Sequence, residues 1–313
     1  MLGLKDHVLL PGYAGYQGTP AASLAPTNAE VADLAHAQGG VVGYVHPFDS
    51  DPDPSDTTHP LTAEFPVDLA LGKVDYYEAM GFVDDPMATA HVWYRALNCG
   101  FRLPAGAGTD AMANFASLRG PVGMNRVYVH TGGAVEQRVL LDSLLAGRTF
   151  ATNGPLLELT IDGRGVGQEL RLPAGTRGVD ARVSLRSNVP IDHLEIIANG
   201  QVVADVLLAS DRTRADTLLW LPVQGSGWFL LRARSDRAMY PVLDLYPYAT
   251  TSPVYVTVAG APIRSAEDAE YFIRWIDRVA ASAVQSQDWN TDAERAAVLD
   301  MMRRARAEFE KRR

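Results

Sequence analysis

Cysteine is almost absent from the sequence, and nothing in it resembles an export signal or a membrane-spanning segment. The single cysteine, Cys99, excludes an intrachain disulfide. A secretory signal needs a continuous apolar run, but Lys5 and Asp6 interrupt the opening segment 1–10. The long uncharged stretch 246–263 contains prolines and threonines, which favour strands over a membrane helix. We therefore expect neither a signal peptide nor a transmembrane segment in this chain, and its compartment stays open.

Basic residues are outnumbered by acidic ones. The chain has 28 Lys and Arg against 37 Asp and Glu, which gives a formal net charge of −9 and a pI near 5.3. A nucleic-acid-binding protein normally presents a basic patch to the phosphates, and only the stretch 303–313 is rich in basic residues. We therefore expect a small-molecule substrate as the partner, and neither a nucleic acid nor a membrane.

The composition otherwise indicates an ordinary globular protein. Hydrophobic residues make up 47% of the 313 positions and charged residues 21%. Because domains usually contain roughly 100–200 residues, a chain of this length is expected to form about two domains with substantial cores. Disorder of the bulk of the chain is therefore excluded.

Helix and strand signals alternate from about residue 27 to residue 150. A capping box of Thr27 and Glu30 begins a helix over 27–40, and a pair of glycines ends it. The expected strands, which are short and rich in β-branched and aromatic residues, cover 41–48, 73–80, 102–111 and 126–131. The expected helices between and after them cover 88–100 and 134–148. This order predicts a β/α arrangement.

The pattern changes after Thr149 to short strands separated by Gly, Pro and Asp. The expected strands cover 156–163, 181–188, 193–203, 217–223, 227–235 and 253–260. Asn199 and Gly200 form a two-residue hairpin signal, since both residue types accept a positive φ. These strands predict an antiparallel β-sandwich of immunoglobulin-like type.

The C-terminal part is predicted to be helical. Capping boxes beginning at Ser265 and Thr291 predict helices over 266–282 and 292–312. The last helix has an apolar stripe formed by Ala297, Val298, Met301, Met302, Ala305 and Phe309. We expect this stripe to pack on the sandwich or on a second subunit.

Three polar residues lie at the carboxyl ends of predicted strands of the β/α region. His46 lies in VGYVHP, Glu78 in DYYEAMGF and Asp110 in AGAGTDAM. In β/α barrels the reacting groups lie at the carboxyl ends of strands, where the loops converge. An imidazole with carboxylates suits Zn, Mn or Fe(II), and a divalent ion can activate water near neutral pH. The sequence therefore predicts a metal site.

Each of these residues also has a structural interpretation. His46 can end its strand with a satisfied hydrogen bond, Glu78 can pair with an arginine, and Asp110 can cap the segment that follows it. The strand-end pattern alone does not choose between the two interpretations.

Several long strings resemble one known family. They include GGVVGYVHPF, VDYYEAMGF, GFRLPAGAGTDAMANFASLRGPVGMNRVYV, GRTFATNGPLLELTIDG and YPYATTSPVYV. In this order they closely resemble the CehA/McbA-type metallohydrolases of the PHP superfamily, over nearly the whole chain. The resemblance implies a distorted β/α barrel that holds divalent metals and cleaves phosphoesters, carbamates or amides. His46 matches the family's HP motif, Asp110 its late aspartate and Glu78 the acidic residue of its D-x-x-E strand.

The sequence departs from the family in two places. It contains no HxH motif, which supplies the metal ligands of the first barrel strand in the family, and only about 40 residues precede His46. Position 112 is Met, a soft ligand, where the late motif often has His. We therefore expect a partial barrel that corresponds to the C-terminal part of a longer protein, with incomplete metal occupancy and weakened activity.

Basic and amide residues within the family-like strings are candidates for substrate contacts. The resemblance implies catalytic roles for Arg119 and Asn153, and substrate binding by Arg119, Asn125 and Arg148. An arginine beside a metal can hold an anionic substrate through bidentate hydrogen bonds. The alternative is structural: Arg119 and Arg126 can fix loops to carbonyls, and 153–155 can form the turn between two domains.

Two functions follow from these observations. The first is a metal-dependent PHP-type hydrolase with a partial β/α barrel over 1–150, a sandwich over 151–262 and a helical segment over 263–313. The second is a non-catalytic module with a degenerate barrel, whose sandwich binds a carbohydrate or another chain through Trp220 and Trp228, although aromatic residues in such strands are more often core. A partial barrel also exposes strand edges, so we expect self-association.

Overall fold

The protein combines helices and β-sheets in an α+β fold. The computed structural model describes residues 1–6, 14–16, 18–48, 50–59, 61, 63–81, 85–112 and 120–313. Within these residues there are six helices and several sheets, and no closed barrel. The chain divides into two compact units. The first comprises 1–44, 52–75 and 264–313, and the second comprises 45–51 and 76–263.

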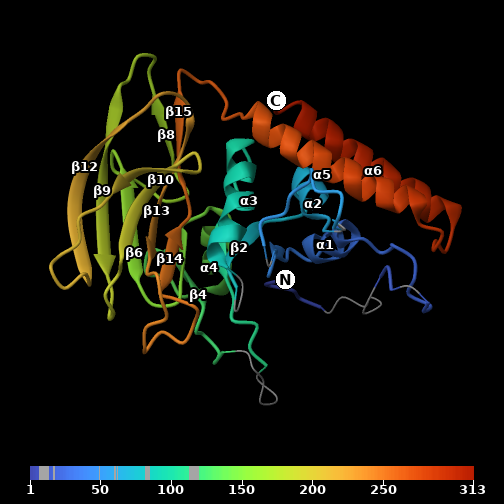
Figure 1. Ribbon diagram of the computed structural model, residues 1–313, viewed down its shortest axis with the longest axis horizontal. Helices are drawn as coiled ribbons and strands as arrows, with labels where there is room; N and C mark the ends of the chain where they lie inside the picture. The colour runs from blue at the N-terminus through green and yellow to red at the C-terminus, as the bar shows by residue number, and fades with distance from the viewer. Residues whose placement is uncertain are drawn as a thin grey trace. The chain divides into compact units, whose positions relative to one another are not determined.

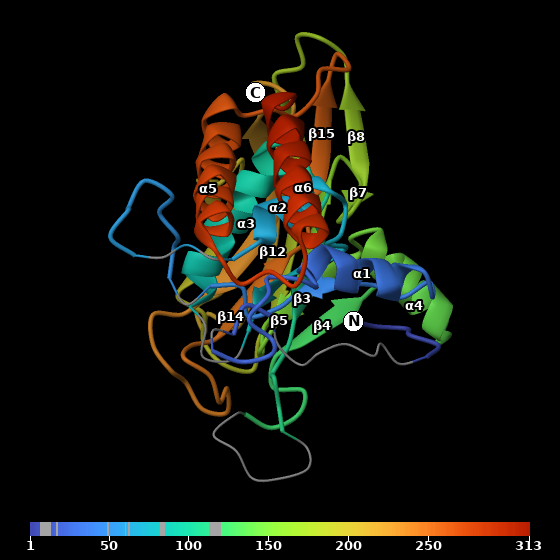
Figure 2. The same cartoon turned by 90° about the vertical axis from the view of Figure 1, so that its right-hand side faces the viewer.

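The first unit is mainly helical. It contains α1 (Asn28–His36), α2 (Phe65–Ala70), α5 (Ala266–Gln285), α6 (Asp292–Glu310) and the short strand β1 (Gly43–Tyr44). The last two helices run side by side as a hairpin (Figure 1), and α2 packs against both of them (Figure 2).

Aromatic packing forms the core of the first unit. The ring of Phe272 on α5 stacks on Phe309 of α6 at 4.8 Å and lies 6.3 Å from Phe65 of α2. Trp275 is fully buried, and its indole N–H donates to the carbonyl of Ala63 at 2.9 Å. The buried part of the apolar stripe of the last helix therefore packs on α5 and α2 and not on the sandwich, and packing on a second subunit stays a prediction.

Three predicted helix starts are confirmed. Thr27 and Glu30 form both hydrogen bonds of the capping box before α1. The hydroxyls of Ser265 and Thr291 accept the backbone N–H groups three residues later, at the starts of α5 and α6. Each hydroxyl satisfies a backbone donor that the first turn of a helix leaves free.

The second unit begins with a parallel strand pair. β2 (Tyr76–Met80) and β3 (Ala105–Ala107) are connected by α3 (Pro86–Asn98). The next strand, β4 (Arg126–Val129), pairs antiparallel with β5 (Thr149–Thr152), and α4 (Gln137–Leu145) lies between them in sequence. β4 therefore belongs to a larger sheet.

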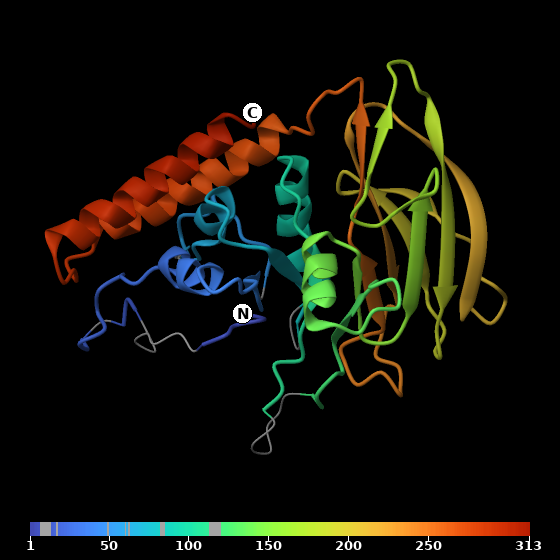
Figure 3. The same cartoon turned by 180° about the vertical axis from the view of Figure 1, so that it is seen from behind.

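Two further sheets complete this unit (Figure 3). The larger has the order β11-β10-β13-β14-β5-β4, with β15 beside β13 and β8 beside β15. The smaller has the order β12-β9-β6-β7. The strand bounds are β6 (Leu156–Ile161), β7 (Arg164–Gly165), β8 (Glu169–Leu172), β9 (Gly178–Arg186), β10 (His193–Ala198), β11 (Gln201–Asp205), β12 (Arg214–Pro222), β13 (Gly227–Arg234), β14 (Tyr248–Thr251) and β15 (Val254–Val258).

The two sheets share one apolar core. Val183 and Leu159 of the smaller sheet and Ile196 and Leu231 of the larger sheet belong to a single cluster of buried side chains. Alternating inward-facing residues, as in the burial pattern of β9, supply this cluster. The predicted β-rich region after residue 149 is therefore confirmed as sheet structure.

A buried polar network joins the parallel pair to the larger sheet. The hydroxyl of Thr149 on β5 donates to the carbonyl of Ala105 on β3 at 2.8 Å. Ser252 accepts the N–H of Ala105 at 2.9 Å and lies 2.7 Å from the Thr149 hydroxyl. These bonds satisfy the backbone N–H and carbonyl groups of Ala105, which would otherwise be buried without hydrogen-bond partners.

The compact units and the predicted domains follow different boundaries. Residues 150 and 151 both lie inside the second unit, and the helical segment after residue 263 belongs to the first unit. The three-domain division stays a prediction.

In the described part of the chain, no helix has the length and apolar character needed to cross a bilayer.

Candidate functional site

The candidate site is built around the carboxylate of Glu78. This residue lies on β2, which pairs with β3, and its side chain is only 6% exposed. Its Oε2 atom accepts the backbone N–H of His46. Its Oε1 atom lies directly beside the Cα of Gly108, so closely that a Cβ at that position would collide with it. One buried carboxylate therefore contacts two separate chain segments.

His46 and Asp110 end those two segments, and both have unusual backbone conformations. The φ angle is +34° at His46 and +52° at Asp110. The four other non-glycine residues with positive φ in the described chain lie in turns beside strands of the two larger sheets: Asp162, Asn199, Arg212 and Ala259. Left-handed non-glycine residues cost free energy and cluster at functional sites. Both side chains are exposed.

Asn125 is tied to the segment that carries Asp110. The buried hydroxyl of Thr109 donates to the carbonyl of Asn125 at 3.1 Å and accepts its N–H at 3.0 Å. The carboxamide of Asn125 is 4% exposed, and neither its oxygen nor its nitrogen has a hydrogen-bond partner among the described residues. A buried amide without partners is costly, so it is a candidate for binding a ligand.

The remaining candidates have different environments. Arg119 lies outside the described residues. Arg148 is exposed and immediately precedes β5. Arg126 donates to the carbonyl of Gly123 at 2.9 Å, which fits the structural role considered for it.

Asn153 is buried, and both the nitrogen and the oxygen of its carboxamide form hydrogen bonds. Its carboxamide nitrogen donates to the carbonyl of Tyr246 at 2.8 Å and to the Asp244 carboxylate at 3.1 Å. Its oxygen accepts the N–H of Tyr248 at 2.8 Å. These bonds hold the segment before β14, and the catalytic role of Asn153 stays a prediction.

The donor atoms fit a divalent metal only in part. The imidazole of His46 and the carboxylate of Asp110 are of the types that Zn, Mn or Fe(II) accept. Among the described residues, however, no three His, Cys, Asp or Glu side chains gather into a group that could hold an ion. Glu78 already accepts a backbone N–H and is enclosed by Gly108. The exposed pair thus forms an incomplete set of ligands.

Sequence reasoning missed two residues of this arrangement. Gly108 allows the close approach of Glu78, and Thr109 connects the end of β3 to Asn125. Two glycines within AGAGTDA were the available signal, because glycine in a strand often marks a close backbone approach.

Comparison of the chain with protein-family models, curated proteins and solved structures finds no match.

Proposed function

We propose that this protein is a metal-dependent hydrolase, with His46 and Asp110 as metal donors and Glu78 as the residue that positions them. The substrate class is a phosphoester, carbamate or amide. The remaining coordination positions would be filled by water or by groups outside the described residues. This proposal follows the resemblance of the sequence to PHP-type metallohydrolases.

One observation carries the proposal. The buried Glu78 carboxylate contacts both the backbone of His46 and Gly108, two residues before Asp110. The two exposed side chains that sequence patterns single out therefore extend from segments that meet at one carboxylate. Both have a positive φ, a costly conformation that an unspecialised loop has little reason to keep.

The chain's own residues would bind and orient the substrate. A bound divalent ion would supply a water of lowered pKa and polarise the attacked oxygen. Arg148, which is exposed, can attract an anionic substrate.

The finer architecture belongs to the same proposal. The parallel pair β2 and β3, connected through α3, would be the remnant of a PHP-type barrel. The two facing antiparallel sheets with a common core would be an immunoglobulin-like sandwich. The expected homo-oligomer, formed through strand edges, also remains a proposal.

Metal analysis of the full chain tests the proposed function. The protein would be purified with Zn²⁺ or Mn²⁺, its bound metal measured by elemental analysis, and its hydrolysis of bis(p-nitrophenyl) phosphate followed. His46→Ala and Asp110→Asn should each lose most of the bound metal and the metal-dependent activity. His130→Ala is the matched control, because His130 is an exposed histidine of the same unit. Equal metal content in all four proteins would reject the proposal.

A second candidate function is supported by an exposed tryptophan. Trp220 on β12 is 62% exposed and Leu218, two residues earlier on the same face, is 59% exposed. The ion pair between Arg186 and Asp216, at 2.8 Å, lies on this sheet beside a hollow of about 490 Å³. Leu218 lines this hollow, and Trp220, on the same sheet, offers an exposed ring of the kind that stacks on a sugar. Trp228, in contrast, is fully buried and donates its indole N–H to Asn98 at 2.9 Å.

Binding of soluble polysaccharides distinguishes the two functions. If the sheet is a binding face, Trp220→Ala should abolish retardation of the protein in gels that contain the polysaccharide. Tyr240→Ala, which removes another exposed aromatic ring, should leave it unchanged. Absence of binding across a panel of neutral polysaccharides would reject this second function and leave the first unaffected.

A further inference from the structure

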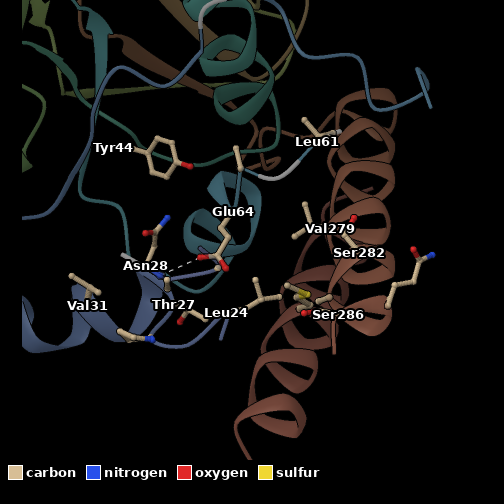
Figure 4. Close-up of a pocket in the computed structure, with 17 residues that line it drawn as sticks. Leu24, Thr27, Asn28, Val31, Tyr44, Leu61, Glu64, Val279, Ser282 and Ser286 are labelled. Carbon is tan, nitrogen blue, oxygen red and sulfur yellow. Dashed lines mark hydrogen bonds between the residues drawn. The ribbon is translucent and has the colours of Figure 1, made fainter. Parts of the chain in front are cut away.

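A large cavity lies within the first unit, and none of the residues of the proposed hydrolase site line it. Its volume is about 830 Å³, within the range of roughly 300–1,000 Å³ found for small-molecule sites. It is lined by residues that precede or belong to α1, by residues before α2, and by α5 and α6 (Figure 4). All of these belong to one compact unit.

The walls of the cavity combine apolar and polar side chains, and α5 contributes Ser282, Gln285 and Ser286 to them. Val279 of α5 and Met302 of α6 are largely buried and supply apolar surface. Asn28, Tyr44 and Glu64 lie on the opposite wall (Figure 4). A ligand held here would therefore have an apolar body and one polar end.

The polar wall carries negative charge. Glu64 immediately precedes α2, and its Oε2 atom accepts the backbone N–H of Asn28 at 3.1 Å. Burial raises the pKa of Glu64, and the nearby Glu30 raises it further. The charged carboxylate is thus short of compensating interactions at the position where it borders the cavity.

A second carboxylate lies immediately behind this wall. Asp68 is one helical turn after Glu64, so both side chains leave the same face of α2. Asp68 is only 2% exposed, and the Asn28 side chain and the charge of Lys73 are the interactions that favour its charged form. Burial, and then the charge of Glu64, raises its pKa to about 8. A carboxyl group with this pKa is mostly protonated at pH 7, so Glu64 is the residue that gives the wall its negative charge.

The cationic side chains of the surrounding segments are engaged elsewhere. Lys73 forms an ion pair with Asp33. The guanidinium of Arg278 on α5 donates to the carbonyls of Asp56 and His59. Within the described residues neither Glu64 nor Asp68 takes part in an ion pair. Glu64 is therefore a carboxylate that lines the cavity and has no ion-pair partner among the described residues.

We propose that this cavity binds a small organic cation, with an ammonium group against Glu64 and an apolar body against Val279 and Met302. Glu64 supplies the charge of the site, and Tyr44 and Asn28 set the shape of the polar end. The site lies in a different unit from His46 and Asp110, so its success or failure is independent of the hydrolase proposal.

The experiment compares a cation with its neutral isostere. Binding of phenethylammonium and of 2-phenylethanol to the full chain would be measured by isothermal titration calorimetry at pH 7. The ammonium should bind at least roughly tenfold more tightly, because charge-assisted hydrogen bonds are about twice as strong as neutral ones. Absence of ammonium binding, or equal affinity for the two compounds, would overturn the proposal.

Variants identify the site. Glu64→Gln keeps an acceptor for Asn28 but removes the charge, so it should weaken ammonium binding roughly tenfold and leave alcohol binding unchanged. Ser282→Trp should fill the cavity and abolish binding of both compounds. Glu267→Gln, on the exposed first turn of α5, is the matched control. Circular dichroism would verify folding. Equal effects of Glu64→Gln and Glu267→Gln would also overturn the proposal.

Discussion

Gly108 allows the Glu78 carboxylate to lie directly against the backbone after β3. A Cβ at this position would overlap Oε1 of Glu78, and the carboxylate, buried and bonded to His46, has little room to move. We predict that Gly108→Ala lowers the free energy of unfolding by roughly 1–3 kcal/mol, as overpacking does elsewhere. Chemical denaturation followed by circular dichroism measures this change.

A matched glycine substitution isolates the steric cause. At Gly225 a Cβ would meet no atom within 4 Å, and its φ is not positive. Gly225→Ala should therefore change the free energy of unfolding by no more than about 0.5 kcal/mol. Similar losses in both variants would show that the contact with Glu78 does not limit position 108.

Asp68 predicts an unusual pH dependence of stability. Its pKa is raised from 3.8 to about 8, first by burial and then by Glu64, while Lys73 opposes the shift. Between these values the unfolded chain has lost the proton and the folded chain retains it. The favourable contribution of this group is therefore complete below pH 4 and is lost progressively up to about pH 8. The loss is at most roughly 1.4 kcal/mol per pH unit.

The variant Asp68→Asn should remove this slope. Its free energy of unfolding should exceed that of the unchanged protein at pH 8, and the difference should shrink toward pH 4. Glu64 and Tyr44 face the same region and keep their own contributions. Asp288→Asn, at an exposed position, is the control. If the free energies of unfolding of the protein and of Asp68→Asn change with pH in the same way, the raised pKa of Asp68 is contradicted.

Individual residues of the site were predictable only where a strand ends. His46, Glu78 and Asp110 follow from the rule that reacting groups gather at the carboxyl ends of strands. Sequence could not indicate that Glu78 would turn inward to a backbone N–H and be buried. It also could not indicate that the Asn125 carboxamide would be left without partners among the described residues. Both depend on contacts between distant segments.

The hairpin between β10 and β11 depends on its two-residue turn. Asn199 and Gly200 have φ angles of +51° and +86°, as the sequence predicts for a type I′ turn. Asn199 also accepts the N–H of Trp228 through its side chain at 3.0 Å. We predict that Gly200→Val lowers the free energy of unfolding by roughly 1–3 kcal/mol, since a β-branched residue resists positive φ.

Thermal unfolding monitored at 218 nm measures the effect of the turn. Gln201→Val places the same side chain at the next, exposed position of β11, where the backbone is extended. This control should be neutral or slightly stabilising because valine favours strands. If both valine variants unfold at the same temperature, the turn does not require glycine.

Local signals predicted the element types better than their lengths. The caps at Thr27, Ser265 and Thr291 are encoded within four residues, and all three are observed. The strand expected over 41–48 is reduced to β1, and the one expected over 102–111 is reduced to β3. Pro47 follows His46, and Pro104 immediately precedes β3. Because proline cannot donate a hydrogen bond to a neighbouring strand, both strands are shorter than expected.

At the scale of the molecule, the sequence could not predict which segments assemble. The apolar stripe of α6 indicated that the helix packs on something, but a stripe does not identify its partner. Phe309 and Phe272 stack within a unit that also contains segments from the start of the chain. This association joins residues more than 200 positions apart, such as Trp275 and Ala63, and no local pattern encodes it.

Two compact units with separate cores predict two unfolding transitions in differential scanning calorimetry. Phe272 and Leu231 are each fully buried, the first in the helical unit and the second between the two facing sheets. Truncating a buried Phe or Leu to Ala costs roughly 2–5 kcal/mol. Phe272→Ala should therefore lower the temperature of one transition, and Leu231→Ala that of the other. Each variant is the control for the other, because both remove a core side chain of similar burial. A single transition lowered equally by both would mean that the units unfold as one cooperative structure.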